Sequence, residues 1–381
     1  MNDLLRKLPI GIQTFEKLRK GDHLYVDKTE LVWKIAYTST PYFLSRPRRF
    51  GKSLLLSTFE AYFEGKKELF EGLKIMSLEK EWKSYPVVRL DMSMADATPE
   101  GIKAYFDETF AKYEAQYGIT PRSLTALSNR FKNIIVAAYE QTGLQVAVLI
   151  DEYDTPLIEA YTDGYWDEMI TTCRQLFHNT LKENDYLGRA IITGVTKVSK
   201  NSLFSDLNNL LVATVTDDIY TDCCGFTEQE VMDALKCQNI DDMKKVKEMY
   251  DGFIIGHQKD IYNPWSIVNY MKERLLRSYW ILTSSNKLIG EIIRRHPVRS
   301  KHEIEQLMAG EIIHKEINEN ITFQYLDGDE NSLWSLFLAV GYIKAENVVK
   351  QGESTWCDMS VTNREVMGMF RYEILAMFEN G

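Results

Sequence analysis

The sequence has few cysteines, and they lack the spacings typical of disulfide-rich or zinc-binding proteins. It contains five cysteines in 381 residues, none of them in a Cys-x-x-Cys pair. An odd number without such spacing predicts neither a disulfide framework nor a zinc site, so we expect reduced thiols. The histidines show no metal-ligand spacing either. The cysteines are Cys173, Cys223, Cys224, Cys237 and Cys357.

The sequence also lacks a long apolar run. The stretch at residues 333–343 is too short to span a bilayer, and residues 1–11 have no apolar core of a signal peptide. We therefore expect a cytoplasmic protein with no membrane partner.

Basic residues are fewer than acidic ones. The chain has 45 Lys and Arg against 55 Asp and Glu, a net charge of −10. This balance argues against broad nonspecific contact with nucleic acid, although a local basic groove stays open as an alternative. A hydrophobic content of 45% with 12% aromatic residues predicts a globular chain long enough for two or more domains.

What the sequence does contain is a phosphate-binding pattern at residues 46–53, Arg-Pro-Arg-Arg-Phe-Gly-Lys-Ser. We expect a strand at residues 41–44 before it and a helix at residues 52–63 after it, so that backbone N–H groups at the helix start face anionic oxygens. In that arrangement Lys52 reaches the β- and γ-phosphates of ATP, and the Ser53 hydroxyl is a ligand of Mg²⁺. Taken alone, the pattern fits equally a turn followed by a basic helix start.

The loop departs from the G-x-x-x-x-G-K-[ST] pattern, because Arg46 stands at the position of the first glycine. A residue with a side chain restricts φ there, so we expect a loop of different shape. Arg46, Arg48, Arg49 and Lys52 place four cations within seven residues, which suits a polyphosphate. The predicted nucleotide-binding residues are Arg48, Arg49, Phe50, Gly51, Lys52, Ser53 and Leu54.

A pair of acids follows an apolar strand further along the chain. Residues 144–150 are an almost uninterrupted apolar run, which predicts a central parallel strand. Asp151 and Glu152 come directly after it, where ligands sit in open α/β sheets. We predict Asp151 for the Mg²⁺ shell and Glu152 for polarising the water that attacks the γ-phosphorus, with a solvated loop as the alternative. Asp154 is interpreted as a helix N-cap or turn residue ahead of Pro156.

A second buried strand is predicted at residues 189–194, and it also ends in polar residues. Thr193 is a candidate γ-phosphate sensor, because its hydroxyl could bond the phosphate or the attacking water. A strand-terminating turn at Gly194 explains the residue equally well. The predicted catalytic residues are therefore Glu152, Lys52 and Thr193.

Alternating strands and helices predict an α/β fold, namely a P-loop NTPase with a mostly parallel sheet flanked by helices. A helical lid and a smaller α+β C-terminal region follow it. The expected bounds are residues 1–225 for the ATPase core, 226–275 for the lid and 276–381 for a C-terminal linker or accessory region. Residues 25–29 are a candidate base contact and Trp265 a candidate reporter of the nucleotide state, although we favour ordinary packing for both.

An ordered set of motifs runs through the first 270 residues, at positions 8–11, 25–29, 45–54, 149–154, 204–209 and 262–266. In sequence and spacing they resemble the bacterial AAA-ATPase-like family. The resemblance implies an ATPase domain that members commonly join to a C-terminal nuclease-like domain of the PD-(D/E)XK type. It also implies that an arginine-rich loop without the first glycine is a family trait. On matching positions, the phosphate-loop roles fall on Gly51, Lys52 and Ser53, and the acidic roles on Asp151 and Glu152.

The C-terminal part departs from that family. Residues 283–286, 333–343 and 361–366 resemble the family's linker region, and the sequence ends at Gly381, where the nuclease-like core would be expected to begin. We therefore expect no nuclease activity. The triplet at residues 81–83, Glu-Trp-Lys, lies before a strand of the ATPase half and is interpreted as incidental.

Two interpretations of the function stay open. In the first, Mg²⁺-dependent ATP hydrolysis drives a conformational switch, with a link to nucleic-acid-related or defence functions left open. In the second, the chain is a nucleotide-binding regulatory or interaction module without significant hydrolysis. Retention of both Asp151 and Glu152 favours the first, and the chain end favours the second. An apolar helix face at residues 366–378 needs a partner, within the fold or on another protein, and oligomeric state stays open.

Overall fold

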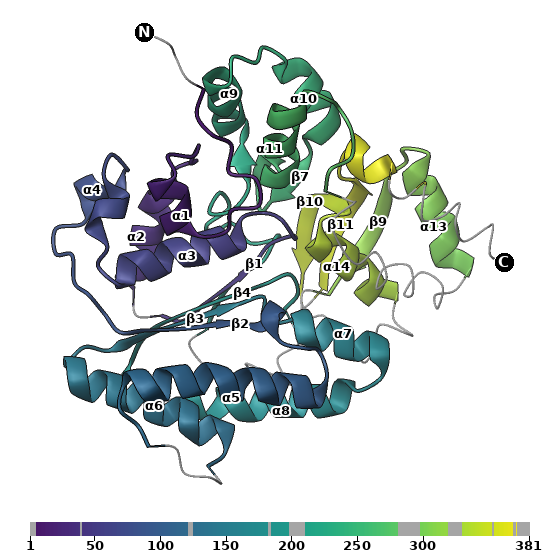
Figure 1. The fold of residues 1–381 in the computed structure, drawn as a ribbon. Helices are drawn as coiled ribbons and strands as arrows, with labels where there is room; N and C mark the ends of the chain where they lie inside the picture. Colours follow the sequence, from purple (N-terminus) through teal and green to yellow (C-terminus); the bar gives the residue numbers. More distant parts are fainter. Residues whose placement is uncertain are drawn as a thin grey trace.

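Short apolar strands build the centre of the fold as a five-stranded sheet in the order β2-β3-β4-β1-β5 (Figure 1). Every pairing within it is parallel. The strands are β1 (Tyr42–Ser45), β2 (Val87–Asp91), β3 (Val146–Asp151), β4 (Leu187–Gly194) and β5 (Leu211–Ala213). The computed structural model describes residues 5–38, 40–120, 125–181, 184–197, 210–280, 298–318, 330–352, 354–368 and 371.

Helices cover both faces of this sheet. Figure 1 shows α1 to α4 on one side of it and α5, α6 and α8 on the other. Local sequence sets their ends: Thr98 caps α5 by accepting a hydrogen bond from Gly101 N, and α6 ends at Gly143 in the left-handed region. The helices are α1 (Phe15–Lys20), α2 (Thr29–Tyr37), α3 (Lys52–Phe63), α4 (Ile75–Leu78), α5 (Pro99–Gln116), α6 (Leu127–Thr142), α7 (Thr155–Asp163) and α8 (Trp166–Leu181).

This architecture confirms the predicted α/β fold with a parallel sheet flanked by helices. The helix predicted at residues 52–63 is α3, and the apolar run at residues 144–150 leads into β3, which is buried along its whole length. Because the strands are parallel, the carboxyl ends of β1, β3 and β4 meet at one edge of the sheet. Polar side chains placed at those ends are thereby brought together.

A second module, called here the middle module, comprises residues 226–273. It contains α9 (Glu228–Cys237), α10 (Met243–Tyr250) and α11 (Pro264–Glu273). The helices of the expected lid pack with an antiparallel sheet in the order β6-β8-β7, which the sequence analysis did not predict. Its strands are β6 (Phe226–Thr227), β7 (Phe253–Ile255) and β8 (Gln258–Tyr262).

The sequence does carry a signal for the hairpin that was missed. Gly256 has φ of 57°, and a Cβ there would lie 2.6 Å from Asp217 O, so a glycine is needed at the turn between β7 and β8. The start of α9 is set by a local sequence signal. The Thr227 hydroxyl accepts from Glu230 N while the Glu230 carboxylate accepts from Thr227 N, which is a capping box.

A third module, called here the C-terminal module, lies within residues 298–368. It contains α13 (Val298–Met308), α14 (Glu330–Val340) and an antiparallel sheet in the order β10-β11-β9. The strands are β9 (Ile313–Ile317), β10 (Ile343–Gln351) and β11 (Ser354–Val361). Helix α14 turns Leu333, Trp334 and Phe337 into the core. The motifs at residues 204–209 and 283–286, and residues 372–378 of the predicted last helix, lie outside the described residues.

Among the helices in the described part of the chain, none combines the length and apolar character needed to cross a membrane.

Arg46 joins the end of β1 to the end of β5 and to the segment beyond it. Its side chain is fully buried. The guanidinium donates hydrogen bonds to the carbonyl oxygens of Ser45, Ala213, Thr214 and Tyr220, at 2.7 to 3.0 Å. Hydrogen bonds from a charged donor are stronger than neutral ones, and these four carbonyls would otherwise be left with fewer partners in the interior.

We predict that Arg46→Ala destabilises the chain by about 3 kcal/mol or more, because it removes the shared donor and leaves a cavity. Urea denaturation followed by circular dichroism measures the change. The matched control is Arg6→Ala, which truncates an exposed arginine. Equal midpoints for the two variants would contradict the role given to Arg46.

Candidate nucleotide-binding site

The loop between β1 and α3 places two residues in the left-handed backbone region. Arg49 has φ of 64° and Gly51 has φ of 90°. Gly51 is the N-cap of α3 and adopts this conformation freely, whereas Arg49 does so at a cost of about 1 kcal/mol. Arg46 has no positive φ, so the arginine at the first glycine position is not strained.

The four cations of the loop do not act together. Arg48, Arg49 and Lys52 line a cavity above the sheet edge. Arg46 does not, because its guanidinium is turned back into the protein and held by backbone carbonyls. The expectation of a differently shaped loop therefore has a specific cause: its first residue anchors the loop and faces away from the cavity.

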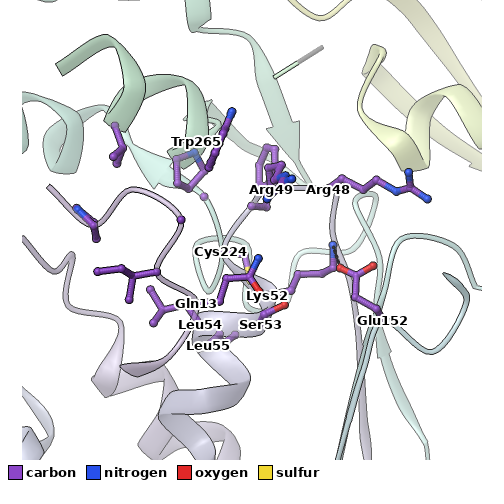
Figure 2. A pocket seen from close by; sticks show the side chains of 18 of the residues that line it. Gln13, Arg48, Arg49, Lys52, Ser53, Leu54, Leu55, Glu152, Cys224 and Trp265 are labelled. Atoms are coloured by element: carbon purple, nitrogen blue, oxygen red, sulfur yellow. Dashed lines mark ion pairs between the residues drawn. The ribbon is translucent and has the colours of Figure 1, made fainter. Parts of the chain in front are cut away.

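Lys52 begins α3 and is 3% exposed. Its Nζ lies 3.2 Å from Arg46 O and 3.1 Å from Pro47 O, and 3.2 Å from the Oε1 atom of Glu152. Figure 2 shows Lys52 and Glu152 at the same end of the cavity. The ammonium group thus has three oxygen partners, of which only Glu152 carries a charge.

Asp151 ends β3 with a fully buried carboxylate. Its Oδ1 accepts a hydrogen bond of 2.6 Å from the Thr193 hydroxyl, and the Ser53 hydroxyl also bonds to the carboxylate. Among the described residues no donor bonds to its Oδ2, although Arg89 Nη2 lies 3.7 Å away. Burial raises the pKa of Asp151 above its usual range, against the two hydroxyl hydrogen bonds that lower it.

Glu152 is next to Asp151 in the sequence, but its pKa is shifted in the opposite direction. Burial acts to raise its pKa, and the charges of Lys52 and Arg48 outweigh that effect, so the pKa lies below the usual value. Its backbone has φ of 50°, which turns the side chain toward α3. Neighbouring acids with pKa values pushed apart are suited to different tasks in one site.

Thr193 lies between the two acids. Its hydroxyl donates to Asp151 and accepts a 3.2 Å hydrogen bond from Glu152 N, and the side chain is 1% exposed. Both of these bonds hold the acidic segment in place, and the residue is not among those described as lining the cavity. Its suggested contact with a γ-phosphate stays a prediction.

Asp154 occupies the N-cap position of α7, as expected, but its carboxylate caps nothing in that helix. Its Oδ2 accepts hydrogen bonds from Val195 N, Thr196 N and the Thr196 hydroxyl, at 2.7 to 3.0 Å. The side chain therefore ties the end of β4 to the start of α7, which is a structural role.

The cavity measures about 600 Å³, within the range of small-molecule sites. One end is charged and is formed by residues 48–53 and Glu152. The other end is mainly apolar and is built from segments far apart in the sequence. Its lining includes Ile10, Gly11, Ile12, Leu24, Val26, Leu54, Trp265 and Val268.

The segment at residues 25–29, a candidate base contact, contributes to this wall through Tyr25, Val26 and Lys28. Tyr25 packs its ring edge-on against Phe15, with centroids 5.2 Å apart. Burial raises the pKa of its phenol, which bonds to Thr58. Tyr25 thus serves packing and lining together.

Trp265, for which ordinary core packing was favoured, stands on the cavity wall at the start of α11. The guanidinium of Arg49 lies over its ring, 4.7 Å from the centroid, and Figure 2 shows the two side chains next to each other. The indole nitrogen donates to Tyr279 O. Tyr262, in the same motif at residues 262–266, is a fully buried core residue.

Sequence reasoning missed several lining residues. Cys223 and Cys224 lie on the cavity wall. Arg89, which was also missed, does not line the cavity but lies near Asp151 and pairs with Glu60 at 2.5 Å. The N-terminal motif at residues 8–11 was a usable signal for the wall. Nothing in the pattern around the two cysteines indicated their position, because it depends on the turn after β5.

Comparison with known proteins identifies the family. Residues 9–204 match the model of the family AAA-ATPase_like, described as predicted AAA-ATPase. A protein of Azotobacter chroococcum mcd 1, described as an uncharacterized protein in the vnfD 5' region, is 31% identical over 382 residues. The match covers 98% of this chain and 70% of that protein.

Solved structures are only distantly similar. A STAND protein with a tetratricopeptide repeat sensor from Pyrococcus horikoshii is 12% identical with a TM-score of 0.32, over 91% of this chain and 42% of that one. Cdc6p from Pyrobaculum aerophilum is 9% identical with a TM-score of 0.33, over 93% of each chain. Scores this low carry no inference about function.

We predict that Asp151→Asn stabilises the fold at pH 8. The raised pKa means that the folded chain resists ionisation of this carboxyl, so stability falls as pH rises from the unfolded pKa through the folded one. The amide removes that penalty, and Tm should rise by about 2 °C at pH 8, with the gain shrinking as the pH falls below the folded pKa. Asp185→Asn, at an exposed carboxyl, is the control. A lower Tm than wild type at pH 8 would contradict the assignment.

Proposed function

Because this chain belongs to the AAA-ATPase-like family of predicted ATPases, we propose that it binds ATP with Mg²⁺ at the sheet edge and hydrolyses the γ-phosphate. The observation that carries the proposal is the pairing of Lys52 with Glu152 across the charged end of the cavity. A buried ammonium at a helix start and a carboxylate facing it are the groups that phosphate binding and water activation require.

The two ends of the cavity suit the two ends of ATP. The start of α3 supplies backbone N–H groups without partners in the helix, which favours the triphosphate there. Arg48 and Arg49 add positive charge to the same end. The apolar end, bounded by Ile10, Val26 and Trp265, is suited to a purine base.

Binding would exchange the partners of Lys52. Its ammonium is now shared between two loop carbonyls and Glu152. A phosphate oxygen carries more charge than a carbonyl oxygen and would take over part of this coordination. The Glu152 carboxylate would then lose its main counter-charge and become available to another donor.

The residues at the sheet edge also fit Mg²⁺. The buried Oδ2 of Asp151, to which no described donor bonds, and the Ser53 hydroxyl are hard oxygen ligands beside each other. Within the described ranges no group of three or more His, Cys, Asp or Glu side chains could hold a metal ion, and a Mg²⁺ held largely by phosphate and water needs none. When bound, Mg²⁺ neutralises negative charge on the phosphate oxygens.

Glu152 is the proposed acceptor of the proton from the attacking water. Its lowered pKa means that Glu152 is ionised at neutral pH before nucleotide binds, and a base must be ionised to accept a proton. Thr193 holds the backbone N–H of Glu152 and the carboxylate of Asp151 at once, so we assign it to positioning both acids.

The phosphate loop is hydrogen-bonded to the middle module and to Trp280, which lies between the two modules in the sequence, and these contacts support a conformational switch. Arg48 O accepts hydrogen bonds from the indole of Trp280 at 3.0 Å and from the amide of Asn263 at 3.4 Å. The ring of Phe50 meets that of Phe253 in the middle module, with centroids 4.8 Å apart. A change in the loop on nucleotide binding or release would therefore be felt at these contacts.

Glu365 extends the connection into the C-terminal module. It is fully buried, and burial raises its pKa. Its carboxylate accepts from Tyr279 N, Trp280 N and the hydroxyl of Ser266, at 2.7 to 2.9 Å. Trp280 also packs edge-on against Tyr342, with ring centroids 5.5 Å apart. Trp280, which bonds to the phosphate loop through Arg48 O, is thus held in place by Glu365.

We predict that Glu152→Gln keeps ATP affinity and lowers the turnover rate by about 10² to 10⁴, because the base is lost and the shape is kept. Lys52→Ala should weaken ATP binding at least about tenfold, since one charge-assisted contact is lost. Steady-state phosphate release and fluorescent-nucleotide titration measure the two effects. Glu159→Gln, at another acid on the cavity wall, is the control and should hydrolyse ATP as the wild type does.

Tight binding without turnover in the wild type would favour the alternative of a nucleotide-binding regulatory module. Full turnover in Glu152→Gln would remove Glu152 from the role of base. Absence of nucleotide binding in the wild type would contradict the proposal as a whole.

We predict that Trp280→Phe uncouples the loop from the C-terminal module, because it keeps the ring and removes the donor to Arg48 O. Hydrogen–deuterium exchange of β10 and β11 with and without ATP measures the coupling, and the ATP-dependent difference should fall at least by about half. Nucleotide affinity is recorded in parallel. Trp33→Phe, in α2, is the control, and an undiminished difference in Trp280→Phe would exclude this connection.

A further inference from the structure

Two adjacent thiols lie on the wall of the proposed nucleotide cavity. Cys223 and Cys224 are reduced and buried, and both line the cavity near the phosphate loop. Figure 2 shows Cys224 behind Lys52 and Ser53. The other three cysteines are not among the described residues that line this cavity.

The turn that carries the thiols is held at both ends by the phosphate loop. Tyr220 O accepts hydrogen bonds from the Arg46 guanidinium and from Cys223 N. At the other end Gly225 N donates to Phe50 O at 2.9 Å. A Cβ at Gly225 would lie 3.1 Å from the Phe50 ring, so the turn is pressed against the loop. Movement of the turn and of the loop are therefore linked.

The chemical state of the pair favours reaction between its members. The two thiols belong to adjacent residues, and both line the same cavity. A hydrogen bond from the Cys224 thiol lowers the pKa of Cys223 to about 7 despite burial, with help from the positive charges of Arg46 and Lys28. The same interaction and burial raise the pKa of Cys224. A substantial fraction of Cys223 is thus thiolate at neutral pH, and Cys224 is a thiol that can resolve its oxidation product.

We propose that Cys223 and Cys224 form a reversible oxidation site, in which a hydroperoxide converts the pair to a disulfide that weakens nucleotide binding. The second part rests on the proposed function of the cavity. The proposed site undergoes redox chemistry, and neither cysteine is among the residues assigned to ATP hydrolysis.

The steps balance with one peroxide per pair. The Cys223 thiolate attacks the O–O bond, which breaks to leave a sulfenic acid on Cys223, and the departing oxygen takes up a proton and leaves as water or an alcohol. The sulfur of Cys224 then attacks that of Cys223, so that the S–S bond forms, the S–O bond breaks and a water leaves with the thiol proton. The two sulfurs are oxidised by two electrons in all, and the peroxide is reduced.

Ring closure has a defined mechanical consequence. Adjacent Cα atoms are about 3.8 Å apart, shorter than the roughly 4.4–6.8 Å usual across a disulfide, so the backbone at Cys223 and Cys224 must twist. Such strain makes a disulfide easier to reduce, which suits a reversible site. The twist is passed to Gly225, whose N–H holds Phe50 O beside the phosphate-binding residues. By linkage, bound nucleotide must oppose oxidation to the extent that oxidation opposes nucleotide binding.

The test treats the reduced chain with a small molar excess of hydrogen peroxide and follows it by intact mass and peptide mapping. Nucleotide affinity is measured on the reduced, oxidised and dithiothreitol-treated protein. We expect the loss of two hydrogens, mapped to a peptide with Cys223 joined to Cys224, at least about fivefold weaker binding and recovery on reduction. ATP added beforehand should slow the reaction.

Variants separate the pair from general thiol damage. Cys224→Ser keeps the attacking sulfur and cannot close the ring, so peroxide should leave a dimedone-reactive sulfenic acid on Cys223 and no internal disulfide. Cys237→Ser, at an exposed cysteine outside the cavity, should behave as the wild type does. Each variant is compared with its own reduced form.

Two outcomes would overturn the inference: no Cys223–Cys224 disulfide in the mass map, or a disulfide that leaves nucleotide affinity unchanged. Failure of the proposed function would give a different result, because the reduced protein itself would then bind no nucleotide. The mass map would still show whether the two thiols form a disulfide.

Discussion

The buried guanidinium of Arg46 constrains the cavity more than any residue that lines it. By donating to Ala213 O, Thr214 O and Tyr220 O, it fixes the end of β1 against β5 and against the turn beyond. The loop must then leave β1 in one direction, and its carbonyls are placed where Lys52 Nζ can reach Arg46 O and Pro47 O. A glycine there would give the loop its shape through φ alone, whereas this chain gives it through side-chain hydrogen bonds.

Two acids at the sheet edge, Asp151 and Asp154, are fully buried, and ionising a buried carboxyl costs free energy. Burial raises the pKa of Asp151 and of Asp154, so their ionised forms are destabilising unless a partner is supplied. Asp154 has such partners in Val195 N and Thr196 N, which makes it structural. Each of the two carboxylates has one oxygen with donors and one to which no described donor bonds. Asp151 is the candidate metal ligand because the Ser53 hydroxyl at the start of α3 also bonds to its carboxylate.

Much of this arrangement could be predicted from the sequence, because local rules decide it. The apolar run of β3, the helix start at Lys52 and the capping box at Thr227 depend on neighbours a few residues away. The direction of Arg46 could not be predicted, since it depends on carbonyls of β5 that are distant in sequence. The hairpin of β7 and β8 was missed because its strands are short and its turn has a single glycine, a weak signal beside three helices. The apolar wall of the cavity could not be predicted because it also depends on segments that are distant in sequence: α11 and the N-terminal segment meet only in the folded chain.

The contacts of Arg48 connect the proposed nucleotide site to the C-terminal module through Trp280. Its carbonyl accepts a hydrogen bond from Trp280, and the charge of its side chain helps to lower the pKa of Glu152. One residue thus acts on the proposed base and also bonds to Trp280. Trp280 in turn is fixed by Glu365, a buried acid whose acceptor oxygens are matched by backbone and hydroxyl donors. Under the proposed switch, a movement of the loop would either carry Trp280 with it or break the hydrogen bond to Arg48 O. An element with two such arrangements is the kind that a bound nucleotide could bias.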